Sequence, residues 1–419
     1  MRIGIIGAGI AGLTAARLLS RAHDISVFEA ARYPGGHANT VLVPDQGRTL
    51  PIDTGFIVFN EPNYPILCRL FDELGVPHHA SDMSFSVHCE RTGREWNGSS
   101  FRQVFADPRN LVRPSHWGML WDIHRFHSHA QDALGAGLSD QVTVAQWLKQ
   151  KGYGRGFTQH YLLPLGASLW SCSQGRFETF PMRFVIEFLS NHRMLQVDQR
   201  PGWRTVTGGS REYVSRMIAP FARRIRLNCP VRRVVRHGQG VDVTDARGRV
   251  ERFDEVVLAC HANQSLALLC NPDDTERSVL ESFPYQPNEA VLHTDVTLLP
   301  DREAAWASWN YRIPPAGAGD VTVTYDMTRL QGLDTARRWC VSLNPAKRVN
   351  PAKVERRFRY DHPVFTPGRD RAQAAHSELI RRRGISYCGA YWGFGFHEDG
   401  ARSALAVCEA FHESLAQAA

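Results

Sequence analysis

The feature that most constrains the fold of this 419-residue chain lies at its beginning. Residues 2–6 form a short apolar run, residues 7–12 read GAGIAG, residues 13–21 are rich in alanine and leucine, and residues 25–28 form a second apolar run that ends at Glu29. This order predicts a strand, a tight glycine turn, a helix and a second strand, which together make a βαβ unit. Because a βαβ unit builds a parallel sheet, the pattern indicates an α/β fold.

Gly7, Gly9 and Gly12 occupy the three glycine positions of the GxGxxG pattern. Glycine at these positions permits the turn, lets the backbone approach a pyrophosphate, and lets the helix pack closely on the strand. The N–H groups at the start of the helix then face the phosphates. Glu29 ends the second strand, where a carboxylate can accept hydrogen bonds from a ribose and disfavours a 2′-phosphate. A glycine turn without a ligand is the alternative, and the flanking strands, helix and carboxylate argue against it.

With the next element, EAARYPGGHANT, the chain resembles the flavin amine oxidase superfamily. Members of that superfamily follow GxGxxG and a ribose-binding glutamate with a Gly-Gly-Arg element that wraps the pyrophosphate of FAD. Gly35 and Gly36 match the paired glycines, whereas His37 replaces the arginine and so removes one charged phosphate donor.

Further motifs resemble the same superfamily. Asp53 and Gly55 in IDTGF match a DxG turn that reaches the flavin, and residues 208–209 match a central Gly-Gly motif. Residues 399–401 match a helix whose N-terminus points at the flavin ring, where it stabilises the negative charge of the reduced state. No covalent attachment motif is present, so the resemblance implies noncovalent FAD. The implied cofactor-binding residues are Gly7, Gly9, Ala11, Gly12, Glu29, Ala30, Gly35, Gly36, His37, Gly55, Val231, Gly389, Asp399, Gly400 and Ala401.

The predicted elements divide the chain into two domains. Residues 101–195 are dominated by helical spacing, whereas residues 290–299 and 339–343 alternate like strands of an antiparallel sheet. Like the first segment, the last one is predicted to contain a strand, at 384–388, followed by a glycine-rich loop and a helix from Ala401 onward. We therefore predict a discontinuous Rossmann-like FAD-binding domain, with an inserted α+β substrate domain. The first comprises residues 1–80, 201–285 and 376–419, and the second residues 81–200 and 286–375.

Three residues are candidates for the chemistry. Amine oxidases of the superfamily usually place a lysine near flavin N5, and His293 in AVLHTDV stands at the matching position. Histidine there can hold a water or move a proton. A buried histidine that pairs with nearby Asp295 is the alternative. Tyr391 and Trp392 lie in the loop before the last helix, where the superfamily faces its substrate with aromatic rings.

The resemblance implies an FAD-dependent oxidoreductase that transfers a hydride from a substrate carbon to the flavin. Aromatic rings near the flavin suit either a cage for an amine or an apolar tunnel for a lipid. The phrases SDMSFSV, LHTDVTLLP and AWASWNYR resemble a bacterial subgroup often encoded near cyclopropane-fatty-acyl-phospholipid synthases. We therefore predict a dehydrogenase or desaturase of a methylated or cyclopropane fatty acyl chain. A flavin amine oxidase that acts on primary, secondary or polyamines is the alternative.

Composition limits the remaining classes. Apolar residues make up 43 % of the chain and charged residues 22 %, which is ordinary for a globular protein. The net charge is +7, and only four of the 49 basic residues are lysines. An arginine surplus suits an anionic partner. Because the arginines are spread over the whole chain without a recognised nucleic-acid module, we expect no nucleic-acid binding. A flavin-binding scaffold without catalysis is a further alternative.

The nine cysteines are scattered and form no CxxC pair, which indicates reduced thiols and a cytoplasmic protein. The apolar run at residues 3–19 is too short and too rich in glycine to span a bilayer. Three consecutive arginines at residues 381–383 predict a solvated loop or, alternatively, a peripheral contact with anionic phospholipid at the inner membrane face. The expected partner is therefore a small-molecule or lipid substrate, with that membrane contact in addition.

One stretch has the composition of a metal site. Its four residues share part of one predicted helix, because positions three apart lie on the same face. No thiolate or second carboxylate joins them, so we predict a solvated helix face and no metal. The residues are Asp122, His124, His127 and His129.

Overall fold

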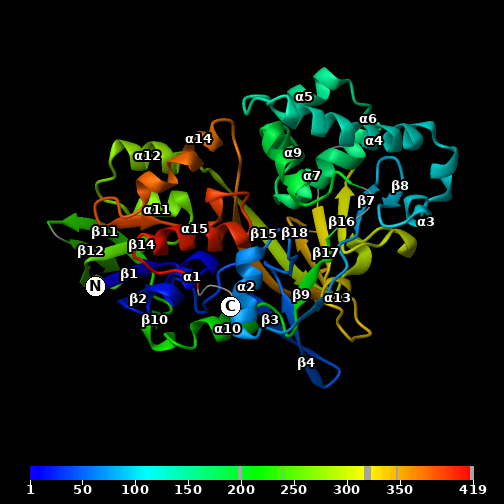
Figure 1. Cartoon of the computed structure of the whole chain (residues 1–419). Coiled ribbons are helices and arrows are strands. Elements are labelled where there is room, and N and C mark those ends of the chain that lie inside the picture. The colour runs from blue at the N-terminus through cyan, green and yellow to red at the C-terminus, as the bar shows by residue number, and fades with distance from the viewer. Residues whose placement is uncertain (197–200, 239, 316–321, 346–347, 416–419) are drawn as a thin grey trace.

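Two sheets organise the protein in a computed structural model that describes residues 1–196, 201–238, 240–315, 322–345 and 348–415 (Figure 1). One sheet has five strands in the order β10-β2-β1-β14-β20, and the other has seven in the order β19-β15-β18-β17-β16-β7-β8. In Figure 1 the five-stranded sheet lies at the left with helices on it, and a cluster of helices lies above the seven-stranded sheet at the right. This arrangement confirms the expected α/β fold.

The five-stranded sheet is parallel throughout. Its strands are β10 (Ile225–Arg226), β2 (Asp24–Phe28), β1 (Arg2–Ile6), β14 (Glu255–Leu258) and β20 (Ile385–Tyr387). The next strand after β10, β11 (Val231–His237), belongs to a separate three-stranded sheet with β12 (Gly240–Asp245) and β13 (Val250–Phe253). The carboxyl ends of β1 and β2 carry the glycine turn and Glu29, as the βαβ pattern predicts.

The seven-stranded sheet is mixed, because β16 and β7 pair in parallel while its other pairs are antiparallel. The expected antiparallel sheet is thus corrected at one pair. The strand predicted over residues 290–299 also ends early: the Asp295 Oδ1 accepts a hydrogen bond from Thr297 N at 3.3 Å and starts a turn instead. The strands are β19 (Val354–Pro363), β15 (Tyr285–His293), β18 (Cys340–Leu343), β17 (Thr322–Asp326), β16 (Trp309–Ile313), β7 (Phe85–Cys89) and β8 (Arg94–Asn97).

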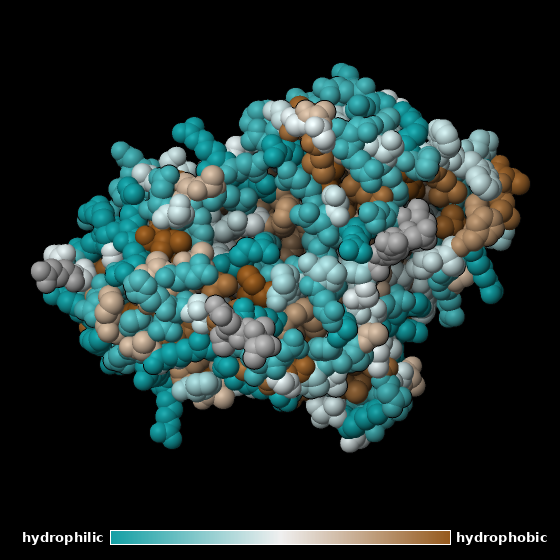
Figure 2. Space-filling model, viewed as in Figure 1, coloured by the Kyte–Doolittle hydropathy of each residue, from teal (hydrophilic) through white to brown (hydrophobic). Residues whose placement is uncertain are grey.

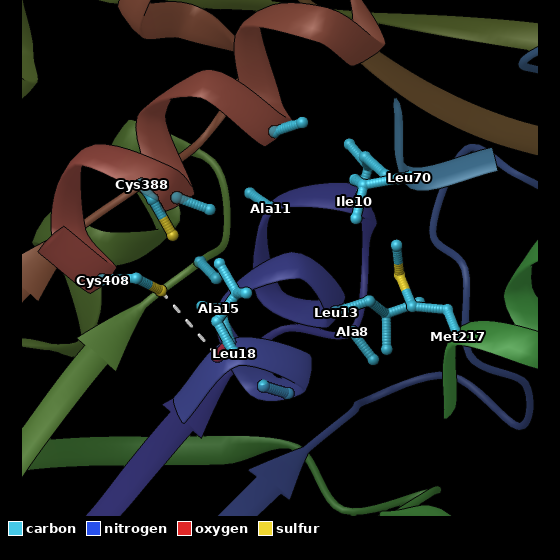
Figure 3. Close-up of a cluster of buried hydrophobic side chains, with 14 of the residues drawn as sticks. Ala8, Ile10, Ala11, Leu13, Ala15, Leu18, Leu70, Met217, Cys388 and Cys408 are labelled. Atoms are coloured by element: carbon cyan, nitrogen blue, oxygen red, sulfur yellow. Dashed lines mark hydrogen bonds between the residues drawn. The ribbon is translucent and has the colours of Figure 1, made fainter. Parts of the chain in front are cut away.

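Helix α1 (Ile10–Leu19) is buried on almost all sides and packs against α15 (His397–Glu409). Figure 3 shows α1 lying against α15, with Ala11 and Ala15 on the facing side and the thiol of Cys408 donating to the carbonyl of Ala15 at 3.9 Å. Close approach depends on small residues here. A methyl group at Gly400 would lie 2.8 Å from the side chain of Ile10, so the two helices meet where a larger residue would separate them.

The helical segment predicted over residues 101–195 is confirmed. It buries an aromatic-rich core, in which Phe126, Trp147, Phe157 and Phe184 are each at most 1 % exposed. Its helices are α3 (Phe101–Val104), α4 (Pro114–Gly135), α5 (Val144–Lys151), α6 (Arg155–Phe157), α7 (Leu163–Leu169), α8 (Gln174–Glu178) and α9 (Met182–Asn191).

Smaller elements connect the two halves. The hairpin of β3 (Thr40–Asp45) and β4 (Arg48–Asp53) lies in the range predicted for the cofactor domain, yet it buries apolar side chains in the core beside the seven-stranded sheet. The proposed domain boundaries stay a prediction. The other named elements are α2 (Pro65–Leu74), β5 (Val58–Phe59), β6 (His78–Ala80), β9 (Arg204–Val206), α10 (Arg211–Ile218), α11 (Ala262–Leu268), α12 (Asp274–Glu281), α13 (Met327–Leu330) and α14 (Arg369–Ala374).

Candidate active site

A cavity of about 710 Å³ extends from the glycine turn to the space between the helical cluster and the seven-stranded sheet. We call its two parts the cofactor half and the substrate half. The cofactor half is lined by Gly7, Ala8, Gly9, Ala11, Glu29, Ala30, Gly35, Gly36, His37, Gly55, Val231, Ala259, Cys260 and Gly389. The substrate half is lined by Met83, Phe85, Leu165, Leu169, Trp170, Ser171, Phe188, His192, Met194, Trp309, Tyr325 and Leu343.

The glycine turn forms an open cradle at the edge of this cavity. A methyl group at Gly9 would have no neighbour within 4 Å, so the backbone there faces open space. Gly7 has a φ of 106°, which only glycine adopts readily, and its N–H donates to the Phe28 carbonyl at 2.8 Å. Gly12 does not line the cavity: a methyl group there would lie 1.9 Å from the Gly7 carbonyl oxygen. Its role is helix-to-strand packing rather than contact with a ligand.

Glu29 is fixed beside the cradle by two backbone donors. Its Oε2 accepts from Ala8 N at 2.7 Å, and its Oε1 accepts from Ala31 N at 2.8 Å. Each carboxylate oxygen still has a lone pair for a further donor. A carboxylate in this position suits a ribose, because both hydroxyl groups of a ribose can donate to it.

His37 is buried in the cofactor half and belongs to a histidine group with His261 and His362. The ring centroids of His37 and His362 lie 5.4 Å apart, and those of His37 and His261 lie 6.1 Å apart. Burial, and then the neighbouring His362, hold the pKa of His37 well below its ordinary value. Its Nε2 has no hydrogen-bond partner among the described residues. The open cradle, the carboxylate and this unpartnered nitrogen together fit a flavin dinucleotide.

Helix α15 places its predicted residues differently from expectation. It begins at His397, so the run 399–401 lies inside the first turn and does not line the cavity. The Asp399 Oδ2 accepts from Phe396 N at 3.0 Å and caps the helix, while Ala401 is fully buried against the fold. Burial raises the pKa of Asp399 to about 6. The run therefore secures the start of α15, and His397 is the α15 residue that reaches the cavity.

The adjacent residues Tyr391 and Trp392 pack on each other, with ring centroids 5.0 Å apart, but only Tyr391 of the two lines the cavity. Tyr391 lines the cavity, although its ring packs on Phe283 at a centroid distance of 5.0 Å. Trp392 is turned away from the cavity and stacks on His376 at 4.2 Å. The structure thus brings one of these two predicted catalytic residues, Tyr391, to the cavity.

His293 lies outside the cavity. It is fully buried at the end of β15, where Asp295 N donates to its Nδ1 at 3.0 Å and its Nε2 lies 2.8 Å from the Ser342 Oγ. Since Nδ1 accepts, the proton is on Nε2, which donates to Ser342. The structure therefore gives His293 the buried, hydrogen-bonded position that was the alternative to a place beside the flavin.

Replacing His293 by alanine is expected to lower stability without lowering flavin content. The change would leave the Asp295 N–H unpaired, remove one of the two hydrogen bonds of the Ser342 hydroxyl, which keeps Thr324 as a partner, and open a cavity, which together cost about 2–4 kcal/mol. Chemical denaturation and the ratio of flavin to protein absorbance measure the two effects separately. Loss of flavin reduction at unchanged stability would contradict this placement.

The same residue predicts a pH dependence. Burial lowers the pKa of His293 to about 4, whereas a histidine in the unfolded chain titrates near 6.5. Between these values the unfolded chain binds the proton more readily, so His293 contributes stability above pH 6.5 that is lost as the pH falls toward 4. A His293→Gln variant should lose less stability over this range, by on the order of 2 kcal/mol. If the free energy of unfolding falls equally with pH in the variant and in the wild type, this prediction is wrong.

The substrate half carries no charged side chain among the described residues. In the whole described lining, Glu29 and Asp361 are the only members of the set Asp, Glu, Lys and Arg. Asp361 lies beside the histidine group and pairs with Arg359 at 3.5 Å. Two described lining residues of the substrate half are titratable: burial lowers the pKa of His192 to about 4 and raises the pKa of the Tyr325 hydroxyl, so both are uncharged near neutral pH. This half is therefore an apolar, aromatic chamber that is neutral at pH 7.

Several lining residues were not predicted from the sequence. Trp309 and Tyr325 stand opposite each other on β16 and β17, with ring centroids 5.1 Å apart, and Trp170 follows α7. His397 stacks on Phe56 at 3.9 Å. Trp309 lies in AWASWNYR, a phrase that carried the resemblance, so its aromatic residues were an available signal. The others come from distant segments that only the fold brings together.

Two other sequence candidates have structural roles. Asp122 on α4 is buried, accepts from Arg125 Nη1 at 2.6 Å, and accepts from Gly154 N at 2.9 Å, so it joins α4 to the start of α6. His129 contacts the Tyr153 hydroxyl at 2.8 Å. Asp122 is thus a packing residue rather than part of a solvated face.

Among the described residues, none of the helices is both long and apolar enough to cross a bilayer.

A dinucleotide cradle on a parallel sheet, joined by one cavity to an aromatic chamber, is the arrangement typical of nucleotide-dependent oxidoreductases. The model of the family described as flavin containing amine oxidoreductase matches residues 10–310, and the chain belongs to this family. The family description names flavin-containing oxidoreductases. The match begins directly after Gly9 and covers α1, Glu29, the paired glycines at 35–36, the central helices and Trp309.

Comparison with known proteins agrees with this family. The chain is 29 % identical over 259 residues to a Mycobacterium tuberculosis protein provisionally named flavin-containing monoamine oxidase AofH, covering 59 % of this chain and 54 % of that one. The chain thus spans about half the length of this curated relative.

Among solved structures, a putrescine oxidase variant has a TM-score of 0.69 at 17 % identity and covers 98 % of this chain and 99 % of its own. Cyclohexylamine oxidase from Brevibacterium oxydans has a TM-score of 0.66 at 16 % identity, covering 98 % and 99 %. A fatty acid isomerase from P. acnes has a TM-score of 0.65 at 17 % identity, covering 96 % of both chains. At these identities the likeness establishes the fold.

Proposed function

We propose that the flavin is FAD and that it is bound noncovalently in the cofactor half. The support is the open cradle at Gly9 together with Glu29, since a carboxylate at the end of β2 serves an adenosine ribose. Purified protein should be yellow, and acid precipitation should release the flavin into the supernatant. Colourless protein that cannot be reconstituted with FAD would refute FAD binding. Yellow colour that stays with the precipitate would refute noncovalent attachment.

Glu29→Ala is expected to weaken FAD retention by about 1.5–3 kcal/mol, the contribution of hydrogen bonds to a charged group. The matched control is Glu29→Gln, which keeps an acceptor oxygen but removes the charge. FAD affinity, measured by titrating apoprotein and following flavin fluorescence, should fall in the order wild type, Gln variant, Ala variant. Equal affinities in all three would show that no part of FAD contacts this side chain.

We propose that the substrate is a long acyl chain, methylated or cyclopropanated, and that the reaction is its dehydrogenation. The observation that supports this is the absence of charge from the described lining of the substrate half. An unpaired carboxylate beside a fatty chain costs several kcal/mol or shifts its pKa, so a tunnel for such a chain must be neutral. Aromatic and aliphatic side chains instead stabilise it by removing its surface from water.

The residues of the substrate half can orient a chain and exclude water. A bound flavin supplies hydride acceptance from a substrate carbon. His192 can supply proton acceptance: its Nδ1 donates to the Phe188 carbonyl at 2.9 Å, which leaves Nε2 as the nitrogen with a lone pair. Its lowered pKa keeps that nitrogen unprotonated near neutral pH. The stacked rings of Phe188 and His192, 3.9 Å apart, fix its orientation.

An amine substrate is the second candidate. Trp170, Trp309 and Tyr325 present aromatic faces that could surround an ammonium group or a neutral amine. The relatives named as monoamine, putrescine and cyclohexylamine oxidases support this candidate. Unlike an acyl chain, a cationic amine would have to leave water to enter the chamber, which costs free energy. The described lining of the chamber carries no carboxylate to compensate, so only the aromatic rings would offset this cost.

Anaerobic reduction of the bound flavin separates the two candidates. Under one set of conditions, acyl phospholipids with methyl or cyclopropane groups are compared with primary, secondary and polyamines. The proposal expects bleaching by the lipids. Rapid bleaching by an amine with none by lipids would assign the protein to the amine oxidases proper, and a flavin that no panel member reduces would refute both candidates.

A further inference from the structure

An exposed apolar patch lies far from the parallel sheet, on α3, the 3-10 turn η1 (Pro108–Val112) and the first turns of α4. Figure 2 shows apolar side chains gathered at the right edge, where Figure 1 places α3 and the start of α4. Five of the nine large apolar residues that are exposed in the described chain belong to it, whereas such residues are usually scattered singly. The patch comprises Phe101 (73 % exposed), Leu111 (50 %), Val112 (82 %), Trp117 (47 %) and Trp121 (64 %).

The members of the apolar patch form one continuous surface. The Phe101 ring lies 4.9 Å from the Phe105 ring, which lies 5.2 Å from the Trp117 ring. Trp117 Nε1 donates to the Leu111 carbonyl at 2.9 Å, which ties η1 to α4. Trp121 follows Trp117 by four residues and so lies on the same face of α4.

The charges around the apolar patch are positive. Between residues 98 and 128 the acids are Asp107 and Asp122, and both are buried and paired with arginines. Exposed Arg102 on α3 and Arg155, at the start of the α6 helix that packs on α4, have no ion pair among the described residues. One exposed acid, Glu303, lies on the short turn η5 (Glu303–Ala305), which contacts α3.

The arginine run at residues 381–383, the sequence's candidate for a lipid contact, is engaged elsewhere. Arg381 pairs with Glu255 at 3.0 Å and Arg382 pairs with Asp273 at 2.8 Å. These two side chains therefore tie the loop before β20 to β14 and to the start of α12. Arg381 and Arg383 are nevertheless exposed, so a contact of this run with anionic phospholipid stays a prediction.

We propose that the apolar patch docks the protein on the surface of an anionic lipid bilayer. Tryptophan and phenylalanine side chains favour the interface between water and hydrocarbon. Unpaired arginines beside them attract anionic headgroups, an attraction that salt screens. Docking goes beyond the proposed reaction and does not depend on it.

Vesicle flotation with the FAD-loaded full chain tests this proposal. The wild type is expected to float with phosphatidylglycerol vesicles, to float less in high salt, and to float poorly with pure phosphatidylcholine vesicles. The double variant W117S/W121S should bind at least about tenfold more weakly, because two interfacial rings are removed. The matched control L42S/V250S removes two exposed apolar side chains outside the apolar patch and should bind like the wild type. Arg102→Glu should reduce binding, whereas Arg223→Glu, at an exposed arginine on another surface, should not.

Three outcomes would overturn the proposal. These are no flotation of the wild type, equal flotation of W117S/W121S, and a wild-type dimer in lipid-free solution that W117S/W121S converts to a monomer. The last result would assign the apolar patch to a second copy of the chain. Because flotation is read without turnover, its failure is separate from any failure of the acyl substrate in flavin reduction.

Discussion

Gly9→Ala is expected to lower FAD affinity at least a hundredfold, about 2.7 kcal/mol, while leaving the fold intact. Gly9 has a φ of −77° and a ψ of −175°, which alanine adopts without strain. The added methyl group meets no protein atom within 4 Å, so it points into the open cavity. In a GxGxxG turn this is the space through which the backbone approaches the pyrophosphate.

Gly12→Ala is the matched comparison for Gly9→Ala. The same methyl group at Gly12 would lie 1.9 Å from the Gly7 carbonyl oxygen, so α1 would have to move away from β1. We expect a loss of about 3 kcal/mol or more in the free energy of unfolding, as for other overpacked sites. Thermal unfolding of the apoproteins and titration with FAD give stability and affinity separately. If Gly9→Ala binds FAD like the wild type, the pyrophosphate does not approach the backbone at Gly9.

These two glycines also show what the sequence can and cannot reveal. Gly7, Gly9 and Glu29 could be predicted because their spacing within one βαβ unit fixes where they lie. Gly12 belongs to the same pattern, but its glycine is required by packing and not by a ligand. A pattern identifies a position that must lack a side chain without identifying the atom that would collide with it. The start of α15 is a second case, because Gly400 faces Ile10 rather than the cavity.

His293 could not be placed from the sequence for a different reason. Side chains alternate along a strand, so a shift of one residue moves a side chain to the other face of the sheet. The pairing of β15 with β19 shifts between Leu292 and His293, where a bulge ends the regular register. A resemblance between strands therefore locates the strand but not the direction of a residue beside its bulge.

The substrate half was beyond local patterns because its lining comes from segments far apart in the chain. Phe85, Leu169, Phe188, Trp309 and Tyr325 belong to β7, α7, α9, β16 and β17 in turn. Each of them, read alone, is an ordinary core residue. Their common property, a chamber without charge in its described lining, exists only after the helical cluster closes over the mixed sheet, and it is this property that supports an acyl substrate.

Leu169→Asp is therefore expected to lower the rate of flavin reduction by an acyl lipid at least a hundredfold. Leu169 ends α7 and lines the substrate half, where it is half-buried, so the change introduces a carboxylate beside the chain with little disturbance of the core. Placing an apolar chain against an unpaired carboxylate costs several kcal/mol, and about 2.7 kcal/mol corresponds to a hundredfold. For a cationic amine the same carboxylate supplies the missing counter-charge, so reduction by amines should be unchanged or faster.

Two controls separate charge from shape at this position. Leu169→Asn has nearly the same volume as the aspartate variant but no charge, and Leu169→Met keeps an apolar side chain. The effect of the charge should also depend on pH, because protonation of the introduced carboxyl removes its charge. Burial raises the pKa of that carboxyl, so as the pH falls through this pKa, the rate of flavin reduction by the acyl lipid should rise in the Asp variant relative to the Asn variant. Anaerobic stopped-flow reduction of all three variants measures these rates. Equal rates for Asp and Met variants with an acyl lipid would mean that the acyl chain does not pass through the substrate half, and the acyl proposal would then fail while the flavin site stands.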